Sequence, residues 1–557
     1  MLIDTRFRGC APTAGGPIAA CKLFCWQSIL LPMRLARVLG AIGFAAASAL
    51  VLAGQTPPTL TDPVRIEQGL LAGTPGRNAD VRVYRGIPYA AAPAGDLRWK
   101  PPQPPASWQG VRDASKPGNA CPQPPYPTNG LYGSAPPPIG EDCLNLNIWT
   151  PAKSAGDRLP VMVWIHGGGF SHGTGAAIGY DGENLARHGV VVVTINYRLG
   201  IFGLLALPEL AAESPHHSAG NYAFLDQIAA LQWVRGNIAK FGGDPERVTI
   251  FGESAGADSV NVLMASPLAQ GLFARAIAES GGLFGPMPSL AEAERMGREF
   301  ARRIGATGDV LQVLRAKPAD ELIKAATDDD VDPLVDGWLL PKTVYSIFAE
   351  GKQNDVPVIV GSNANEGTIF PPPKGAITPA DFTANAQKVY GPFSKDFLKV
   401  YPPGATDADA TASYFAAFRD GQFAWNMRIW ARLQGTTGHR RAYRYYFSRV
   451  VPGRGERLGA FHGSELAYVF ANFPYRVWYQ DWDKQLAETI ETYWANFARS
   501  GDPNGSGLTA WPVYDSTKDN VLGLGDTVSV QFKVDSSGLD FFDDFNRSIR
   551  PSRPDAK

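Results

Sequence analysis

Two serines of the chain lie at the centre of a Gly-x-Ser-x-Gly pattern, which can turn a serine hydroxyl into a nucleophile. These serines are Ser254 and Ser171. In the arrangement that favours this chemistry, the serine occupies a sharp turn between a buried strand and a helix, and the glycines keep side chains out of the bend. A hydroxyl exposed in this way can attack a carbonyl carbon once a neighbouring base accepts its proton. Either serine is therefore a candidate for acyl transfer.

The sequence around Ser254 provides the elements that such a turn needs. The apolar residues 248–251 predict a strand that ends just before the motif, and residues 257–264 can continue as a helix. After Ser171, by contrast, the Thr-Gly pair at 174–175 would break a helix. We therefore predict that Ser254 is the nucleophile. The alternative for either serine is a plain tight turn without a catalytic role.

A glycine-rich segment supplies candidates for the second requirement of acyl transfer, the donors that bind the developing oxyanion. Residues 166–169 read His-Gly-Gly-Gly and directly follow an apolar run at 161–165. The backbone N–H groups of these glycines can point at an oxyanion together with the N–H of Ala255, the residue after the nucleophile. A flexible turn is the alternative interpretation of the same residues.

We predict His462 as the base and Glu366 as the acid that orients it. His462 lies on a glycine-flanked loop, where a catalytic imidazole can reach the end of a sheet; a surface histidine is the alternative. The other six histidines lie in less suitable surroundings: His166, His172, His188, His216, His217 and His439. Glu366 is the first carboxylate after the apolar run 356–360, and catalytic groups gather outside the carboxyl ends of parallel strands. The chain order of serine, acid and histidine also fits this chemistry.

These groups need a sheet to position them, and several apolar β-branched runs predict buried parallel strands. The predicted strands are residues 161–165, 190–195, 248–251 and 356–360. Apolar residues at spacings of three and four predict a helix at 224–238, between the second and third strands. Strand, helix and strand in this order indicate an α/β fold with a large, mostly parallel sheet and helices on both faces. Helical insertions are expected near 285–345 and 375–435, and a further helix near 486–497.

The N-terminus carries a predicted targeting segment. Residues 33–37 are basic, residues 38–53 are apolar or small, and polar residues follow, which is the order of a secretory signal peptide. The apolar run is shorter than the ~20 residues of a comfortable membrane span, so a membrane anchor is the alternative. We assign residues 1–32 to an extension from a start codon placed too early, 33–54 to the signal peptide, 55–546 to one domain and 547–557 to a disordered tail. The protein is thus expected to be secreted or periplasmic.

Cysteine usage agrees with export. Three of the five cysteines lie in the first 54 residues, which leaves Cys121 and Cys143. An even pair in an exported protein predicts one disulfide, and two free buried thiols are the alternative.

Charge and chemistry limit the partners. The 52 basic and 53 acidic residues give a net charge of −1, which does not favour a nucleic acid or another polyanion. Serine acyl transfer needs no metal and no organic cofactor, and the expected partner is a small-molecule ester. The sequence gives no indication of the oligomeric state.

Taken together, these segments resemble the type-B carboxylesterase/lipase family of cholinesterase-like α/β-hydrolases, and in particular its secreted bacterial members. The ordered matches are Arg-Gly-Ile-Pro-Tyr at 85–89, Glu-Asp-Cys-Leu-Asn-Leu-Asn at 141–147, Asn-Tyr-Arg-Leu-Gly at 196–200, Phe-Gly-Gly-Asp-Pro at 241–245, Asn-Glu-Gly at 365–367 and His-Gly-Ser-Glu at 462–465. The resemblance spans roughly residues 59–545. It implies an α/β-hydrolase fold and a serine carboxylic ester hydrolase that works through an acyl-enzyme. The residues it implies are a triad of Ser254, Glu366 and His462, an oxyanion hole of Gly168, Gly169 and Ala255, and a Cys121–Cys143 disulfide.

One departure from the family bears on the substrate. Cholinesterases carry a tryptophan in the disulfide loop that stacks on the choline cation. Residues 122–140 contain Tyr126 and Tyr132 but neither a tryptophan nor an acid, so choline esters are not expected. The ester itself stays open among xenobiotic, aryl, polyester and toxin side-chain esters. There are two alternative functions: a non-catalytic adhesion or scaffold protein on the same fold, and an amidase.

Overall fold

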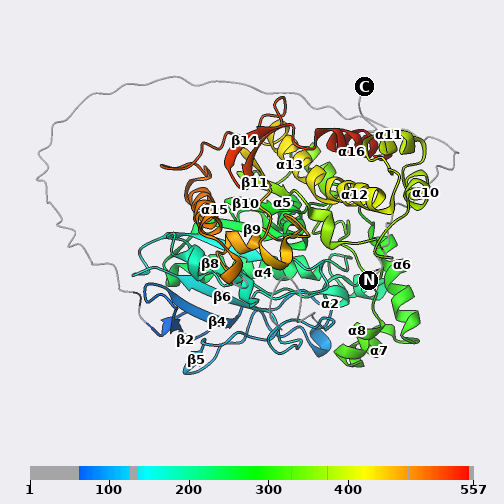
Figure 1. Ribbon diagram of the computed structural model, residues 1–557. Coiled ribbons are helices and arrows are strands. Elements are labelled where there is room, and N and C mark those ends of the chain that lie inside the picture. The colour runs from blue at the N-terminus through cyan, green and yellow to red at the C-terminus, as the bar shows by residue number, and fades with distance from the viewer. Residues whose placement is uncertain are drawn as a thin grey trace, which may run out of the picture. The chain divides into compact units, whose positions relative to one another are not determined.

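The computed structural model describes residues 60, 62–125, 136–327, 329–372, 374–473 and 476–550, all within the unit Pro57–Lys557 (Figure 1). The predicted N-terminal extension (1–32) and signal peptide (33–54) lie outside the described residues, and so do residues 551–557.

One large sheet runs through the middle of this unit (Figure 1). Its strand order is β14-β13-β12-β11-β10-β9-β7-β8-β6-β4-β3. The strands are β3 Thr74–Pro75, β4 Arg82–Pro88, β6 Asn145–Thr150, β7 Leu159–Ile165, β8 Val191–Ile195, β9 Gly243–Glu253, β10 Arg275–Glu279, β11 Val358–Asn363, β12 Ala442–Phe447, β13 Asn520–Leu524 and β14 Val528–Phe532. Neighbours from β8 to β13 are parallel, and the outer strands on both sides are antiparallel. A small separate sheet contains β1 Val64–Arg65, β2 Leu70–Ala72 and β5 Val111–Asp113.

Helices pack on both faces of the large sheet. They are α1 Glu183–Ala186, α2 Gly200–Leu204, α3 Pro208–Glu213, α4 Tyr222–Asn237, α5 Ala255–Ala265, α6 Leu290–Arg303, α7 Val310–Ala316, α8 Ala319–Ala325, α9 Val344–Ala349, α10 Pro379–Tyr390, α11 Ser394–Val400, α12 Asp407–Phe418, α13 Trp425–Thr436, α14 Leu466–Val469, α15 Asp481–Ser500 and α16 Ser536–Ile549.

The central strand β7 shows why the sheet is buried on both faces. Successive side chains of a strand point to opposite faces. Val161, Val163 and Ile165 belong to the core that includes residues of α4 and α5. Met162 and Trp164 belong to a second core with residues of α1 and α15. A strand that must fill two apolar cores has a continuous apolar sequence, and this is the pattern that predicted it.

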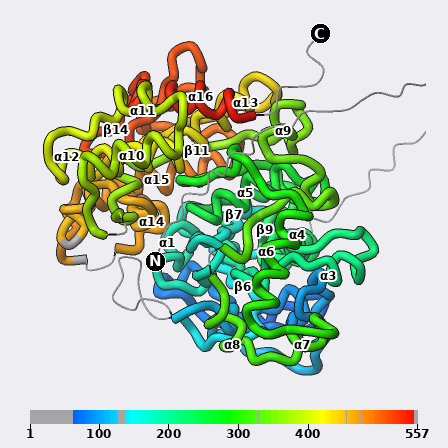
Figure 2. The backbone as a smooth tube through the Cα atoms, turned by 90° about the vertical axis from the view of Figure 1, so that its right-hand side faces the viewer, coloured from blue at the N-terminus to red at the C-terminus, as the bar shows by residue number. Residues whose placement is uncertain are grey.

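The predicted insertions are mostly helical and lie at the two ends of the unit. Figures 1 and 2 agree in placing α7 and α8 at one end and α10, α11 and α16 at the other. At the latter end, Tyr390 stacks on Phe397 at a centroid distance of 4.1 Å and meets Phe541 edge-on at 5.4 Å. Aromatic packing thus joins α16, from the end of the chain, to the second insertion.

Several boundaries differ from the sequence prediction, and three of these differences have a clear physical reason. Strand β9 begins at Gly243 rather than at residue 248, because this glycine already pairs with Leu159 of β7. Strand β11 begins at Val358 rather than at residue 356, since Pro357 has no N–H to donate to a ladder. The disordered tail predicted from residue 547 is wrong at its start: α16 continues to Ile549, because its buried phenylalanines pack into the neighbouring helices.

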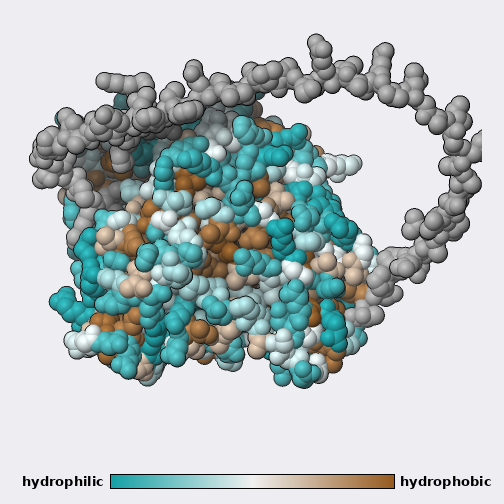
Figure 3. Space-filling model, turned by 180° about the vertical axis from the view of Figure 1, so that it is seen from behind, coloured by the Kyte–Doolittle hydropathy of each residue, from teal (hydrophilic) through white to brown (hydrophobic). Residues whose placement is uncertain are grey.

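Hydrophilic side chains predominate on the one face of the molecule that Figure 3 shows. On the face that Figure 3 shows, apolar side chains occur in small groups among hydrophilic ones. The large apolar side chains that are exposed come from distant parts of the sequence: Val111, Ile139, Ile178, Val450, Val477, Val513, Phe532 and Ile549. No helix among the described residues combines the length and the apolar character that crossing a bilayer requires.

Candidate active site

Ser254 lies on a sharp turn between β9 and α5, with φ 56° and ψ −127°. A residue other than glycine is strained at positive φ, so its neighbours must hold the turn. The N–H of Ser254 donates to the carbonyl of Glu279 at 2.9 Å, and its own carbonyl accepts from the N–H of Asp258 at 2.9 Å. Ser254 therefore occupies the strand–turn–helix position that its motif predicts.

The two glycines of the motif are required by the neighbouring strand β7. A Cβ on Gly252 would lie 2.7 Å from the carbonyl oxygen of Ile165. A Cβ on Gly256 would lie even closer to the same oxygen, deep inside the van der Waals contact distance. Because that oxygen belongs to the backbone of a buried strand, it cannot move aside. The turn can therefore approach β7 only with glycine at both positions.

The His-Gly-Gly-Gly loop after β7 runs directly past the serine turn. Ile165 at the end of β7 pairs with Gly252, so the loop and the turn leave the sheet at the same edge. A Cβ on Gly167 would lie 3.0 Å from the Cβ of Ser254. Gly168 has φ +104°, which side-chain-bearing residues avoid, and a Cβ there would overlap the backbone of the same loop at His172. The loop thus passes close to the side chain of Ser254.

The first residue of this loop has a structural role. The ring of His166 stacks on Tyr197 at a centroid distance of 4.4 Å, and the Tyr197 hydroxyl donates to the His166 carbonyl at 2.6 Å. Burial lowers the pKa of His166 to about 4, so its imidazole stays neutral at physiological pH. His166 fixes the start of the glycine loop, as expected when the sequence assigned it to that loop.

Glu366 and His462 form a buried hydrogen-bonded pair. The Nδ1 atom of His462 lies 2.7 Å from Oε2 of Glu366, whose side chain is fully buried. The other oxygen, Oε1, accepts from the Ser280 hydroxyl at 2.5 Å and from the backbone N–H of Asn363 at 2.7 Å. A carboxylate held at both oxygens has one orientation, and it fixes the orientation of the imidazole in turn.

Backbone contacts join the two loops that carry this pair. The N–H of Asn365 donates to the carbonyl of Ala460 at 2.9 Å, and its Oδ1 accepts from the N–H of Ala460 at 3.0 Å. The side-chain amide of Asn363 also donates to the carbonyl of Phe461 at 2.9 Å. Two segments that lie 96 residues apart in the chain, measured from Glu366 to His462, are thus held together.

The second ring nitrogen of His462 points to the serine turn. Its Nε2 atom lies 3.1 Å from Oε1 of Glu253, the residue that immediately precedes Ser254. The imidazole therefore bridges the Glu366 carboxylate on one side and the turn on the other. Sequence reasoning missed Glu253, because the variable positions of a Gly-x-Ser-x-Gly motif carry no expectation about their side chains.

Three further carboxyl groups are buried near this pair, and sequence reasoning found none of them. They belong to Glu253, Glu279 and Glu465, whose pKa values are all raised, chiefly by burial and for Glu253 and Glu465 also by the neighbouring carboxylates. The pKa of Glu279 reaches about 8, although the indole N–H of Trp494 donates to this carboxyl group at 2.8 Å. A raised pKa favours the protonated form of each group, which limits the negative charge buried behind the imidazole. The one sequence feature that could have pointed to any of these buried acids is the position of Glu465, shortly after His462.

Aromatic side chains flank the imidazole of His462. Phe423 stacks on it at a centroid distance of 4.3 Å, and Phe370 lies at 5.4 Å. Phe418 in turn contacts Phe370 at 5.0 Å. Phe423 belongs to a single π-helical segment, η7 Arg419–Ala424, and all three rings are only partly buried. They form an apolar wall, here called the Phe wall, beside the candidate site.

Ser171, the other motif serine, does not lie between a strand and a helix. It is part of a tight turn in which its N–H donates to the Gly168 carbonyl at 3.1 Å. Its hydroxyl lies 2.8 Å from Nδ1 of the adjacent His172. The flanking elements that distinguished the two motifs in the sequence distinguish them in the structure as well.

Cys121 and Cys143 form a disulfide, as predicted. The side-chain amide of Asn196 donates to the carbonyls of Cys143 at 3.1 Å and Asn119 at 2.9 Å, on either side of the bridge. The disulfide loop is thereby attached to the end of β8. Both Tyr126 and Tyr132 of this loop lie outside the described residues.

A mostly parallel sheet with helices on both faces, together with a serine turn and a glycine loop at one sheet edge, defines an α/β-hydrolase. The chain belongs to the carboxylesterase family, whose model matches residues 61–542. It is accordingly a type B carboxylesterase, a hydrolase of carboxylic esters.

Individual relatives agree with this assignment. The chain is 37% identical to a fumonisin B1 esterase from Sphingopyxis macrogoltabida, over 92% of this chain and 95% of that protein. It is 35% identical to carboxylesterase 1F from Mus musculus, over 84% of this chain and 90% of that protein. Among solved structures it is similar to a PNB esterase, with a TM-score of 0.74 and 32% identity over 86% of this chain and 99% of that one.

Proposed function

We propose that Ser254, His462 and Glu366 form the catalytic triad of this carboxylesterase and that the reaction passes through an acyl-enzyme. The observation that carries the proposal is the position of the His462 imidazole. One ring nitrogen lies 2.7 Å from the Glu366 carboxylate, and the other lies 3.1 Å from the residue directly before Ser254. An imidazole oriented in this way can move a proton to and from a serine at the turn.

The proposed reaction has two matched halves. In the first, the Ser254 hydroxyl attacks the ester carbonyl and gives its proton to Nε2 of His462, so that the carbonyl oxygen becomes an oxyanion. The N–H groups of Gly168, Gly169 and Ala255 stabilise this oxyanion. The ester C–O bond then breaks, and the alcohol leaves with the proton from His462. In the second half, water attacks the acyl-enzyme, His462 accepts its proton, and the proton returns to Ser254 as the acid leaves.

Glu366 orients the imidazole in this cycle and does not itself accept the proton. Its role is to hold the tautomer of His462 with the proton on Nδ1 and to stabilise the imidazolium of each intermediate. The reaction uses only these side chains and backbone amides, so no metal and no organic cofactor takes part.

The Phe wall supports esters with an apolar group as substrates. Phe370, Phe418 and Phe423 present partly buried rings beside His462, and an aryl or alkyl group of the ester can cover them. One relative is named for its action on fumonisin B1. We therefore propose an aryl or alkyl ester as the general substrate and fumonisin B1 as one compound for an activity screen.

We also propose that the mature enzyme is a single domain that begins at residue 55 and includes all of α16, exported after removal of residues 1–54. The Cys121–Cys143 disulfide supports export, because disulfides persist in oxidising compartments. N-terminal sequencing of protein from the periplasm or medium would test the cleavage site. A chain that keeps residues 33–54 and stays with the membrane fraction would support the anchor instead.

The triad is tested with a matched pair of serine variants. Ser254→Ala should lose hydrolysis of a p-nitrophenyl ester and labelling by a fluorophosphonate probe, while its thermal midpoint stays close to that of the wild type. Ser171→Ala, in the other motif, should retain both. Full activity of Ser254→Ala would refute the assignment. A wild type that neither hydrolyses nor reacts with the probe would support a non-catalytic protein, and faster cleavage of a matched amide than of the ester would support an amidase.

A further inference from the structure

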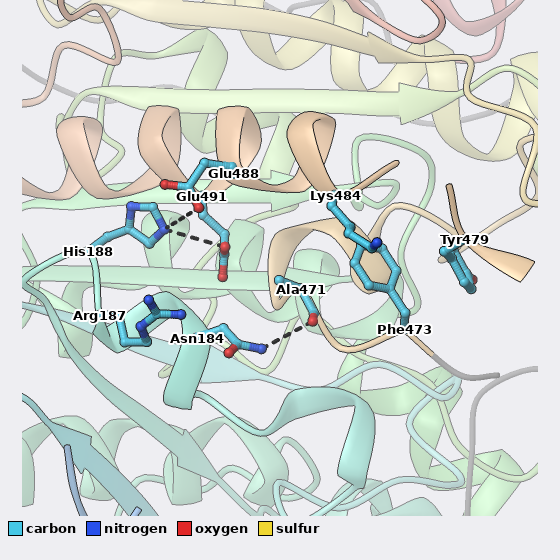
Figure 4. A pocket seen from close by; sticks show the side chains of 9 residues that line it. All are labelled: Asn184, Arg187, His188, Ala471, Phe473, Tyr479, Lys484, Glu488 and Glu491. Carbon is cyan, nitrogen blue, oxygen red and sulfur yellow. Dashed lines mark hydrogen bonds and ion pairs between the residues drawn. The ribbon is translucent and has the colours of Figure 1, made fainter. Parts of the chain in front are cut away.

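A pocket of about 470 Å³ shares no residue with the proposed triad or the oxyanion loop. It lies between α15 and the segment around α1 (Figure 4). Its charged lining residues are Arg187, His188, Lys484, Glu488 and Glu491. One imidazole and two carboxyl groups meet at one side of this pocket.

These three groups bring their polar atoms together. In Figure 4 the side chains of Glu488 and Glu491 descend from α15 toward the ring of His188, which faces them from the other side. The Nε2 atom of His188 lies 3.4 Å from Oε2 of Glu491 and 3.8 Å from Oε2 of Glu488. All three potential ligand atoms lie within 4.8 Å of one another.

Their separation fits a small dication. Two ligands bound to a tetrahedral zinc ion at about 2.0 to 2.1 Å lie about 3.3 to 3.5 Å apart. The two distances from His188 Nε2 are therefore close to the spacing of ligand atoms around one ion, and longer than a good N–H···O hydrogen bond. The Glu488 side chain is 72% exposed, so it can rotate and shorten the longer of the two distances to that spacing.

Glu491 provides an independent reason to expect a ligand. Its side chain is only 3% exposed, and its Oε1 atom accepts no hydrogen bond from any described residue. A buried carboxyl oxygen without a donor is costly, and a cation in the pocket would remove that cost.

Two cationic side chains near the pocket have partners outside the ligand cluster, whereas Arg187 lines the pocket and attracts the negative charge of Glu491. The ammonium group of Lys484 is paired with Asp481 at 2.9 Å, at the start of α15. The Arg499 guanidinium is hydrogen-bonded to the backbone carbonyl of His188 and to the side chain of Asn496. Arg499 belongs to α15 and thereby holds the loop that carries His188 against this helix. The three ligand atoms are therefore brought together before any ion binds.

We propose that His188, Glu488 and Glu491 bind a divalent cation of the zinc type, with water in the remaining coordination positions. An imidazole with two carboxylates is a ligand set that suits zinc, and Glu488 and Glu491 lie one helical turn apart on the same face of α15. The open pocket beside them accommodates the water ligands. The ion would connect two segments that are 300 residues apart in sequence, and it has no part in the proposed hydrolysis.

Zinc binding is measured by titration calorimetry on the full chain, expressed without a histidine tag and freed of metal by chelation. The wild type should bind one zinc ion per chain. Glu491→Gln and His188→Gln should each lower the affinity at least about tenfold, since even indirect disturbance of a zinc site has this effect. Glu488→Gln removes a largely exposed carboxylate, so it tests the site without risk to the fold, and it should also weaken binding. His439→Gln, at an exposed histidine elsewhere, is the matched control and should leave the affinity unchanged.

A thermal readout separates this site from the catalytic proposal. Zinc should raise the thermal midpoint of the wild type and of Ser254→Ala equally, and at the same zinc concentration should raise that of Glu491→Gln less. The proposal is refuted if the wild type shows no saturable zinc binding, or if the three ligand variants bind zinc as tightly as His439→Gln does. In that case His188 and the two carboxyl groups form only an ion-pair cluster.

Discussion

Replacing Glu366 by glutamine should remove most of the hydrolytic activity without unfolding the protein. The backbone N–H of Asn363 points at Oε1 of Glu366 from 2.7 Å and can only donate. The amide oxygen of a glutamine must therefore take the Oε1 position, which places its NH₂ group at the Oε2 position, 2.7 Å from Nδ1 of His462. Nδ1 then has to accept, and the ring proton moves to Nε2. An imidazole with its proton on Nε2 cannot accept the proton of Ser254.

The size of the effect follows from the cost of restoring the productive tautomer. To restore this tautomer, the amide must turn around, so that its NH₂ group faces the N–H of Asn363. This leaves a buried donor unpaired, at a cost of about 1–3 kcal/mol. The neutral amide also loses the charged hydrogen bond to the imidazolium, worth about 1.5–3 kcal/mol. Together these terms correspond to a fall in kcat of between about 10² and 10⁴, and a tautomer trapped in this way favours the upper end.

The assay is steady-state hydrolysis of a p-nitrophenyl ester, with the thermal midpoint measured in parallel. Ser280→Ala is the matched control: it removes one hydrogen bond to Oε1 but keeps the carboxylate, so it should reduce kcat only about tenfold. A folded Glu366→Gln enzyme with kcat within tenfold of the wild type would refute the tautomer argument. So would a Ser280→Ala enzyme as slow as Glu366→Gln.

Three more predictions address the oxyanion loop, the buried acids and the disulfide. Gly168→Ala should reduce kcat by about 10²–10³ and also lower the thermal midpoint, because its Cβ would overlap the backbone of His172. Gly435→Ala, on an exposed helical position with open space, should be neutral in activity; equal rates for the two would contradict the assigned loop. Because burial raises the pKa of Glu279 to about 8 from 4.5, its protonated form stabilises the fold fully below about pH 4.5, and this stabilisation is lost as the pH rises through 8. The thermal midpoint, measured from acid to alkaline pH, should therefore fall less steeply for Glu279→Gln than for the wild type. If the two curves of midpoint against pH are parallel, Glu279 does not titrate in this range. Replacing both Cys121 and Cys143 by serine opens a loop with a sequence separation of 22 and should cost about 3 kcal/mol in unfolding free energy, measured with urea; an unchanged midpoint would exclude this contribution.

The sequence by itself determined the features that depend on neighbouring residues. The strand before Ser254, the helix after it and the glycines around it are local patterns, because an apolar run, a helical period and a tight bend each involve only a few consecutive residues. The same holds for the glycine loop that follows β7. The order of Ser254, Glu366 and His462 along the chain, combined with the family resemblance, was enough to nominate the three residues of the proposed triad.

Only the tertiary structure decided which distant groups meet. The carboxyl groups of Glu253, Glu279 and Glu465 are ordinary acids in the sequence, and their shared burial arises because separate segments converge behind His462. Strand β10 was not predicted either, since a short segment that begins with arginine lacks the continuous apolar pattern of its neighbours. His188 looked like a polar helix residue until α15 placed Glu491 beside it. Burial and proximity are properties of the folded chain as a whole, and no local pattern encodes them.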